Sequence, residues 1–148
     1  MGVAVTFVMV LASLFTYAIN TWVLATLNIE FMQTIVFIFV IASLVQMLEM
    51  VLKKVSPSLY ASLGVYLPLI TTNCAILGIA QANLTAVTNL FMAVLNGAFA
   101  GIGFTLAIFL MSGIREKLDL VDVPRPFKGF PITLITACFM AMAFGVFA

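Results

Sequence analysis

The chain contains no histidine, only two cysteines and few charged residues. Without histidine, the 148-residue sequence offers no imidazole as a metal ligand or general base. Cys74 and Cys138 do not by themselves complete a zinc or iron–sulfur site. Charged residues make up 7% of the chain and the formal net charge is +1. Because no basic patch can form, nucleic acid is not expected as a partner.

Hydrophobic residues, by contrast, make up 65% of the sequence. A soluble domain has about 45–50%, and a chain of this size cannot bury such an excess in one core. Long stretches also carry no charge, namely Met1–Ile29, Val55–Ile114 and Gly129–Ala148. We therefore predict an all-α integral membrane protein that lies in a lipid bilayer.

The hydrophobic runs predict five transmembrane helices in a single transmembrane domain, 1–148, with the helices at about 2–19, 31–52, 63–80, 89–113 and 130–147. Positive charges occur only in the second and fourth connections, at Lys53, Lys54, Arg115, Lys117, Arg125 and Lys128. Positively charged loops usually face the cytoplasm. This multi-pass topology therefore places Met1 inside and Ala148 outside.

An internal repeat is visible in the two halves of the chain. Residues 2–9 read like residues 101–108, and residues 38–43 read like residues 132–137. The paired helices would run in opposite directions, so the repeat is inverted, and such repeats place functional sites near the membrane midplane. Helix 63–80 has no partner. We therefore expect a complete molecule of three plus three helices, of which this chain lacks the first.

The helix predicted at 63–80 contains several residues that disturb a regular helix. Pro68 lacks a backbone donor, and Gly78 adds flexibility. Hydroxyl and amide side chains can satisfy backbone groups that lipid cannot, and the segment supplies them at Thr71, Thr72 and Asn73. We predict a broken helix at membrane depth near Pro68–Cys74. The alternative is a kinked helix with an inert buried cysteine.

Residues 67–78, which read LPLITTNCAILG, resemble the signature of the RnfA/NqrE family of membrane subunits. Further resemblance lies in residues 45–50, 58–60, 114–118, 122–124 and 127–129. Thr72 and the Arg-Glu-Lys-Leu run favour the Rnf branch. The resemblance implies a six-helix subunit of a bacterial cytoplasmic-membrane complex that transfers electrons from ferredoxin to NAD and pumps Na⁺ or H⁺. On its own, such a subunit would have no turnover.

The resemblance also implies a site and partners. A homologous subunit (RnfE-like), in opposite orientation, would share one [2Fe–2S] cluster with this chain, alongside other Rnf subunits. Cys74 matches the second family cysteine, whereas the first lies on the helix that this chain lacks. Cys138 matches no ligand, and we expect it to be a small buried hydrophobic residue.

Glu49 is the only acidic residue embedded in an apolar run. It is either an interfacial residue paired with Lys53 at i+4 or, as the family resemblance implies, an ion-coupling carboxylate.

Gly97 and Gly101 form a GxxxG motif, which predicts close helix packing. The charged connection after residue 113 either sets topology or docks a soluble subunit. Two other functions stay open: an NqrE-type subunit that feeds quinone, and an inverted-repeat transporter or channel without a cofactor.

Overall fold

The computed structural model describes the backbone of residues 1–148 and every side chain except that of Glu30. The described residues form helices and connecting loops, and none lies in a strand, as predicted. The chain divides into two compact units, Met1–Thr105 and Leu106–Ala148, and helix α7 (Leu90–Leu120) contributes to both. Each unit is described by itself.

The first helix is longer than predicted. Helix α1 (Gly2–Ile19) continues without interruption through a π-helical stretch, Asn20–Leu24, into α2 (Ala25–Leu27). The helix ends where Asn28 takes a left-handed conformation with φ 53°, a common way to end a helix. The predicted end of this helix at residue 19 was therefore placed too early, because the backbone stays helical through Leu27.

The middle of the chain forms four helices in place of the two predicted. After a 3₁₀ turn (Glu30–Met32) come α3 (Gln33–Val55), α4 (Pro57–Leu63), α5 (Tyr66–Thr71) and α6 (Cys74–Ala86). Lys53 and Lys54 lie in the last turn of α3, where the helix dipole favours positive charge. Pro57 then begins α4, because a proline costs little at the first helical position.

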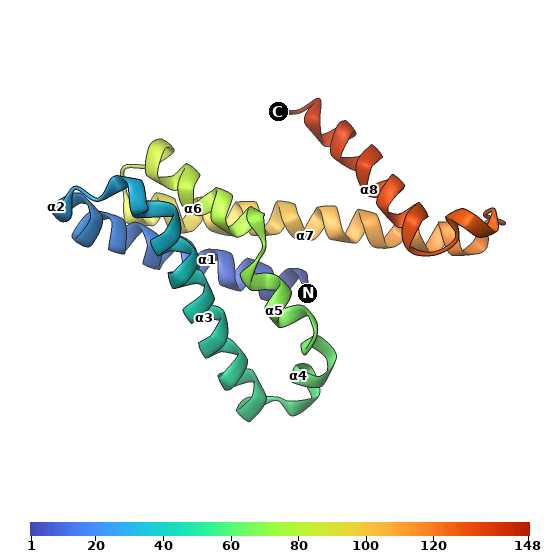
Figure 1. The fold of residues 1–148 in the computed structure, drawn as a ribbon, viewed down its shortest axis with the longest axis horizontal. Helices are drawn as coiled ribbons and strands as arrows, with labels where there is room; N and C mark the ends of the chain where they lie inside the picture. The colour runs from blue at the N-terminus through green and yellow to red at the C-terminus, as the bar shows by residue number, and fades with distance from the viewer. The chain divides into compact units, whose positions relative to one another are not determined.

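The core of the first unit lies where α1 contacts α3 and α6, with α5 against α3 (Figure 1). Its buried residues are Val5, Val8, Met9, Ala12, Ile41, Val45, Leu67, Ile70 and Ile76. The four on α1 recur at the three- and four-residue spacing that defines one helix face. The core is small for a chain this hydrophobic, so many large apolar side chains remain outside it.

Helix α1 also packs against the first part of α7 through small residues (Figure 1). Gly97 and Gly101 are buried, and a methyl group added at Gly101 would lie 2.7 Å from Cγ2 of Thr6. The GxxxG motif therefore permits the close approach that the sequence predicted.

In the second unit, α7 continues to Leu120, followed by a 3₁₀ turn (Arg125–Phe127) and α8 (Phe130–Gly145). The prediction that α7 ends at residue 113 was wrong, so Arg115 and Lys117 lie on the helix and not in a loop. Good helix formers continue past the apolar run, and their charges are exposed. Cys138 on α8 is exposed in this chain, so its predicted burial was also wrong.

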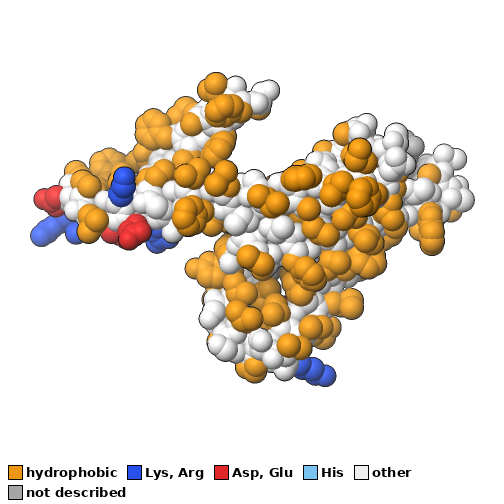
Figure 2. Space-filling view, turned by 180° about the vertical axis from the view of Figure 1, so that it is seen from behind, with side chains coloured by type: hydrophobic (Ala, Val, Ile, Leu, Met, Phe, Trp, Pro, Cys, Tyr) orange, Lys and Arg blue, Asp and Glu red, His pale blue; other side chains and the backbone are white. Residues whose placement is uncertain are grey.

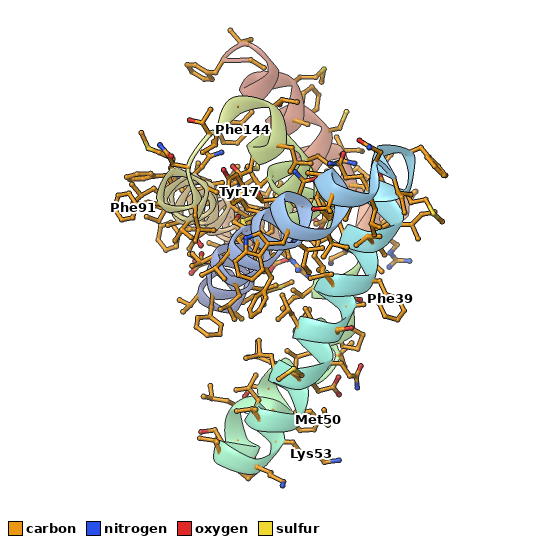
Figure 3. All side chains as sticks on the ribbon, turned by 90° about the vertical axis from the view of Figure 1, so that its left-hand side faces the viewer. Tyr17, Phe39, Met50, Lys53, Phe91 and Phe144 are labelled. Atoms are coloured by element: carbon orange, nitrogen blue, oxygen red, sulfur yellow. The ribbon has the colours of Figure 1, made fainter. Side chains whose placement is uncertain are left out.

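Four helical segments are long and apolar enough to cross a membrane, namely Gly2–Leu27, Gln33–Val55, Tyr66–Ala86 and Leu90–Leu120, and Phe130–Gly145 is a shorter apolar helix. Hydrophobic side chains cover much of the face shown in Figure 2. In Figure 3, Phe39 and Phe91 project away from their helices, with 76% and 72% of their surface exposed. Such apolar surfaces are suited to contact with lipid or with other membrane helices.

Candidate functional site

The predicted break in the third apolar segment is present, and it lies between Thr71 and Cys74. Helix α5 ends at Thr71, and α6 begins at Cys74 after Asn73 takes an extended conformation with ψ 110°. Pro68 is not the cause of the break, because it is the third residue of α5, where a missing backbone donor has little effect. Gly78 lies inside α6, which continues through it.

Three consecutive polar residues satisfy the backbone at this break, as predicted. The Thr71 hydroxyl donates to the Pro68 carbonyl at 2.6 Å, and the Thr72 hydroxyl donates to the Leu69 carbonyl at 3.2 Å. The Asn73 side chain caps α6 by accepting from the Ala75 backbone N–H at 3.0 Å. Backbone groups that lipid could not solvate thus find partners within the chain.

Cys74 is the first residue of α6, and its side chain is exposed. Its sulfur lies 4.0 Å from the Thr72 carbonyl oxygen, and it borders a recess of about 270 Å³. The recess is lined by four residues of the break, Thr71, Thr72, Asn73 and Cys74, and by the apolar residues Ile38, Ile41 and Leu77. Cysteine sulfur is the usual protein ligand of iron–sulfur clusters, so an exposed thiol beside a recess is a candidate ligand.

The described residues do not bring together a complete set of ligands for a metal cluster. Among the described residues, no three His, Cys, Asp or Glu side chains come together in a way that could hold a metal ion. An iron–sulfur cluster takes four thiolates as a rule. Cys74 alone could supply one such thiolate.

Glu49 lies on α3, close to the end at which the chain turns into α4. Its half-buried carboxylate accepts a hydrogen bond from the Tyr60 hydroxyl at 3.3 Å. The pairing of Glu49 with Lys53, one of the two alternatives left open by the sequence, is not found, because no ion pair joins these two described side chains. The Lys53 ammonium instead lies 5.8 Å from the centroid of the Tyr60 ring. Figure 3 shows Lys53 at this end of α3.

Sequence reasoning missed a pair of asparagines, one buried and one half-buried, between α6 and α7. The Asn96 amide donates to Asn83 Oδ1 at 2.6 Å, and Asn83 donates to the Ala93 carbonyl at 3.3 Å. Asn83 is fully buried. The available signal was partial. Asn96 lies in an apolar run, where a polar group usually pairs with another, but Asn83 lies among polar residues outside the helix predicted at 63–80.

The sequence of the chain is similar to those of known membrane subunits. Residues 1–148 match the family described as "Rnf-Nqr subunit, membrane protein". The A subunit of the Na⁺-translocating ferredoxin:NAD⁺ oxidoreductase complex of Acetobacterium woodii is 56% identical over 144 residues, which span 97% of this chain and 75% of that protein. The A subunits of ion-translocating oxidoreductase complexes from Actinobacillus pleuropneumoniae and Escherichia coli are 52% and 51% identical over the same shares.

The fold and the broken helix define a multi-pass, all-helical membrane protein with an exposed cysteine at a helix interruption. More particularly, the chain belongs to the Rnf-Nqr family of membrane subunits. The family resemblance found in the sequence is therefore confirmed.

Proposed function

We propose that this chain is the A subunit of an ion-translocating ferredoxin:NAD oxidoreductase complex in a bacterial cytoplasmic membrane. The relatives that carry such names are 51–56% identical over 97% of the chain. Such identity over nearly the whole chain supports the same place in the same kind of complex. Within that complex, the other Rnf subunits are its partners.

In this proposal, Cys74 binds one iron of a [2Fe–2S] cluster, and a homologous membrane subunit (RnfE-like) contributes further thiolates. The single observation that carries the assignment is the exposed thiol at the start of α6, beside a polar break in an apolar segment. When bound, the cluster supplies one-electron redox chemistry. This chain contributes no bond-making group, so the oxidoreductase and translocase activity belongs to the complex.

The residues around Cys74 position the thiol. Asn73 caps α6 and thereby fixes the first turn, on which Cys74 lies. The hydroxyl groups of Thr71 and Thr72 stabilise the end of α5 by donating hydrogen bonds to backbone carbonyls of that helix. Ile38, Ile41 and Leu77 contribute the apolar part of the recess lining. Hydrogen bonds and the polarity of the surroundings tune the potential of a redox centre.

Ion coupling is assigned to Glu49, the half-buried acid on α3. A carboxylate within a membrane helix is a common element of cation and proton pathways. We propose that Na⁺ or H⁺ passes this carboxylate as electrons pass the Cys74 site. Glu49→Gln, which keeps the size and removes the charge, should lower ion uptake per electron in vesicles.

The test of the site uses Cys74→Ser in the complete complex. We expect the variant to lose the electron paramagnetic resonance signal of one [2Fe–2S] cluster and about two irons per complex. The matched control is Cys138→Ser, which changes the other thiol of the chain and should keep both. Unchanged iron content and spectrum in Cys74→Ser would overturn the assignment.

A transporter or channel without a cofactor is the second candidate, favoured by the broken helix together with an acid inside an apolar helix. Chemical analysis of the purified complex separates the two proposals, because a transporter would contain neither iron nor acid-labile sulfide. The NqrE-type alternative is separated by the electron acceptor. Reduction of quinone instead of NAD⁺ by the purified complex would support it.

A further inference from the structure

Tyr60 contacts both members of a charged pair on the neighbouring helix. Its hydroxyl donates to Glu49 Oε1 at 3.3 Å, and its ring faces the Lys53 ammonium at 5.8 Å from the centroid. Glu49 and Lys53 both lie on α3, and Tyr60 lies on α4. One aromatic side chain thus interacts with a carboxylate through its hydroxyl group and with an ammonium group through its ring face.

Without Tyr60, Glu49 and Lys53 would be expected to pair with each other. They are four residues apart on one helix, with the acid on the N-terminal side, which is the favourable order for an ion pair. The structure shows a different arrangement, in which each charged group has Tyr60 as its partner. A ring face attracts an ammonium group, so Tyr60 offers Lys53 an alternative to the Glu49 carboxylate.

The position of Tyr60 is fixed by the fold. Helix α4 begins at Pro57 directly after α3, and the Tyr60 N–H donates to the Ser56 carbonyl at 3.0 Å. The Tyr60 side chain is half-buried and packs against the hydrophobic core of the first unit, as do Leu48 and Leu52 on α3. Tyr60 therefore holds one place relative to α3 and is not a freely rotating surface residue.

We infer that Tyr60 is a positioning residue that keeps Lys53 from neutralising Glu49, so that the carboxylate stays available to a translocated cation. The inference rests on the proposed ion-coupling role of Glu49. A carboxylate has two oxygens with about four acceptor sites, and the Tyr60 hydroxyl occupies only one. An ammonium group paired with Glu49 would instead compete with the cation for the same negative charge.

The experiment compares variants of the complete complex in sealed membrane vesicles, with ions taken up per electron transferred as the readout. Tyr60→Leu removes both contacts and should lose most ion uptake per electron, because Lys53 is then free to pair with Glu49. Tyr60→Phe keeps the ring and should lose less. Adding Lys53→Met to Tyr60→Leu should restore the ratio, since the competing ammonium is gone.

Lys54→Met is the matched control, because this neighbouring exposed lysine makes no contact with Tyr60 among the described interactions. The number of ions taken up per electron in this variant should equal that of the unaltered complex. Rescue by Lys53→Met separates positioning from folding, since a merely structural Tyr60 would not be restored by removing a lysine. Failure of that rescue, or an unchanged ratio in Tyr60→Leu, would overturn the inference.

Glu49→Gln separates this inference from the function on which it rests. If Glu49→Gln leaves ion uptake per electron unchanged, the ion-coupling role of Glu49 fails, and the inference fails with it. If Glu49→Gln uncouples the complex while Tyr60→Leu does not, only the positioning role of Tyr60 fails.

Discussion

The hydroxyl oxygens of Thr6 and Thr105 lie 3.2 Å apart at the crossing of α1 and α7. Each also lies within hydrogen-bond distance of a glycine carbonyl oxygen four residues earlier, Thr6 at 2.8 Å from Gly2 and Thr105 at 2.9 Å from Gly101. Methyl groups added at Gly2 and Gly101 would each lie 2.7 Å from Cγ2 of the opposite threonine. The contact is thus reciprocal, and it joins positions that the predicted inverted repeat makes equivalent.

This crossing leads to a prediction about Gly101. Gly101→Ala would place a methyl group 2.8 Å from the Thr6 Cα, so the helices must separate. We expect a loss of about 1–3 kcal/mol in the free energy of unfolding, as is usual for overpacked sites. Thermal unfolding in detergent measures it. The control is Gly103→Ala, where nothing lies within 4 Å of the added methyl group, and an equal loss in both variants would contradict the crossing.

The hydrogen bond between Asn83 and Asn96 leads to a second prediction. Asn83→Leu leaves the Asn96 amide without its acceptor. Hydrogen bonds inside membrane proteins contribute about 0.6 kcal/mol on average and at most about 1.7, so we expect a loss of roughly 1 kcal/mol in unfolding free energy. The double variant with Asn96→Leu should lose less than the sum of the single variants. Strictly additive losses would show that the two amides do not interact.

A third prediction concerns the cap of α6. Asn73→Ala removes the side-chain acceptor for the Ala75 N–H and should destabilise the first turn of α6 by about 1 kcal/mol. Asn73→Asp keeps an acceptor and should retain most of that stability. Hydrogen exchange at the start of α6 reports the difference. Equal protection in the two variants would show that the cap has no role in holding the turn that bears Cys74.

A fourth prediction concerns the reactivity of Cys74 when iron is removed. In a Cys138→Ser background, a maleimide should not modify Cys74 in the intact complex, because a metal-bound thiolate is occupied. After removal of iron, the exposed thiol should react. Mass spectrometry of this chain follows the change. Equal labelling before and after iron removal would argue against Cys74 as a cluster ligand.

Much of the fold could be predicted from sequence because its signals are local. Apolar runs free of charge indicated membrane helices, and the polar run Thr71–Asn73 indicated the break in the third of them. The helix ends were less predictable. Helix α7 reaches Leu120 and α1 runs on to α2, since helix formation depends on propensity and hydrogen bonding and does not stop where hydrophobicity falls.

The site was only partly predictable. Cys74 and Glu49 stood out as rare residue types in apolar surroundings, but their neighbours did not. Spacing on one helix allowed Lys53 to pair with Glu49 as one of two alternatives, whereas the turn into α4 brings Tyr60 into contact with both. The spacing of residues in the sequence identifies neighbours on the same helix. It does not identify a contact with a residue on a different helix, such as Tyr60.

Membrane location, helical structure and the interruption beside Cys74 could all be predicted from the amino-acid sequence. These properties follow from the free energy of placing each segment in lipid and from local backbone chemistry. The contacts of Thr6 with Thr105, of Asn83 with Asn96 and of Tyr60 with both Glu49 and Lys53 became visible only in the folded chain. Such pairings depend on how separate helices pack, because contacts between helices are set by shape and by the geometry of the turns that join them.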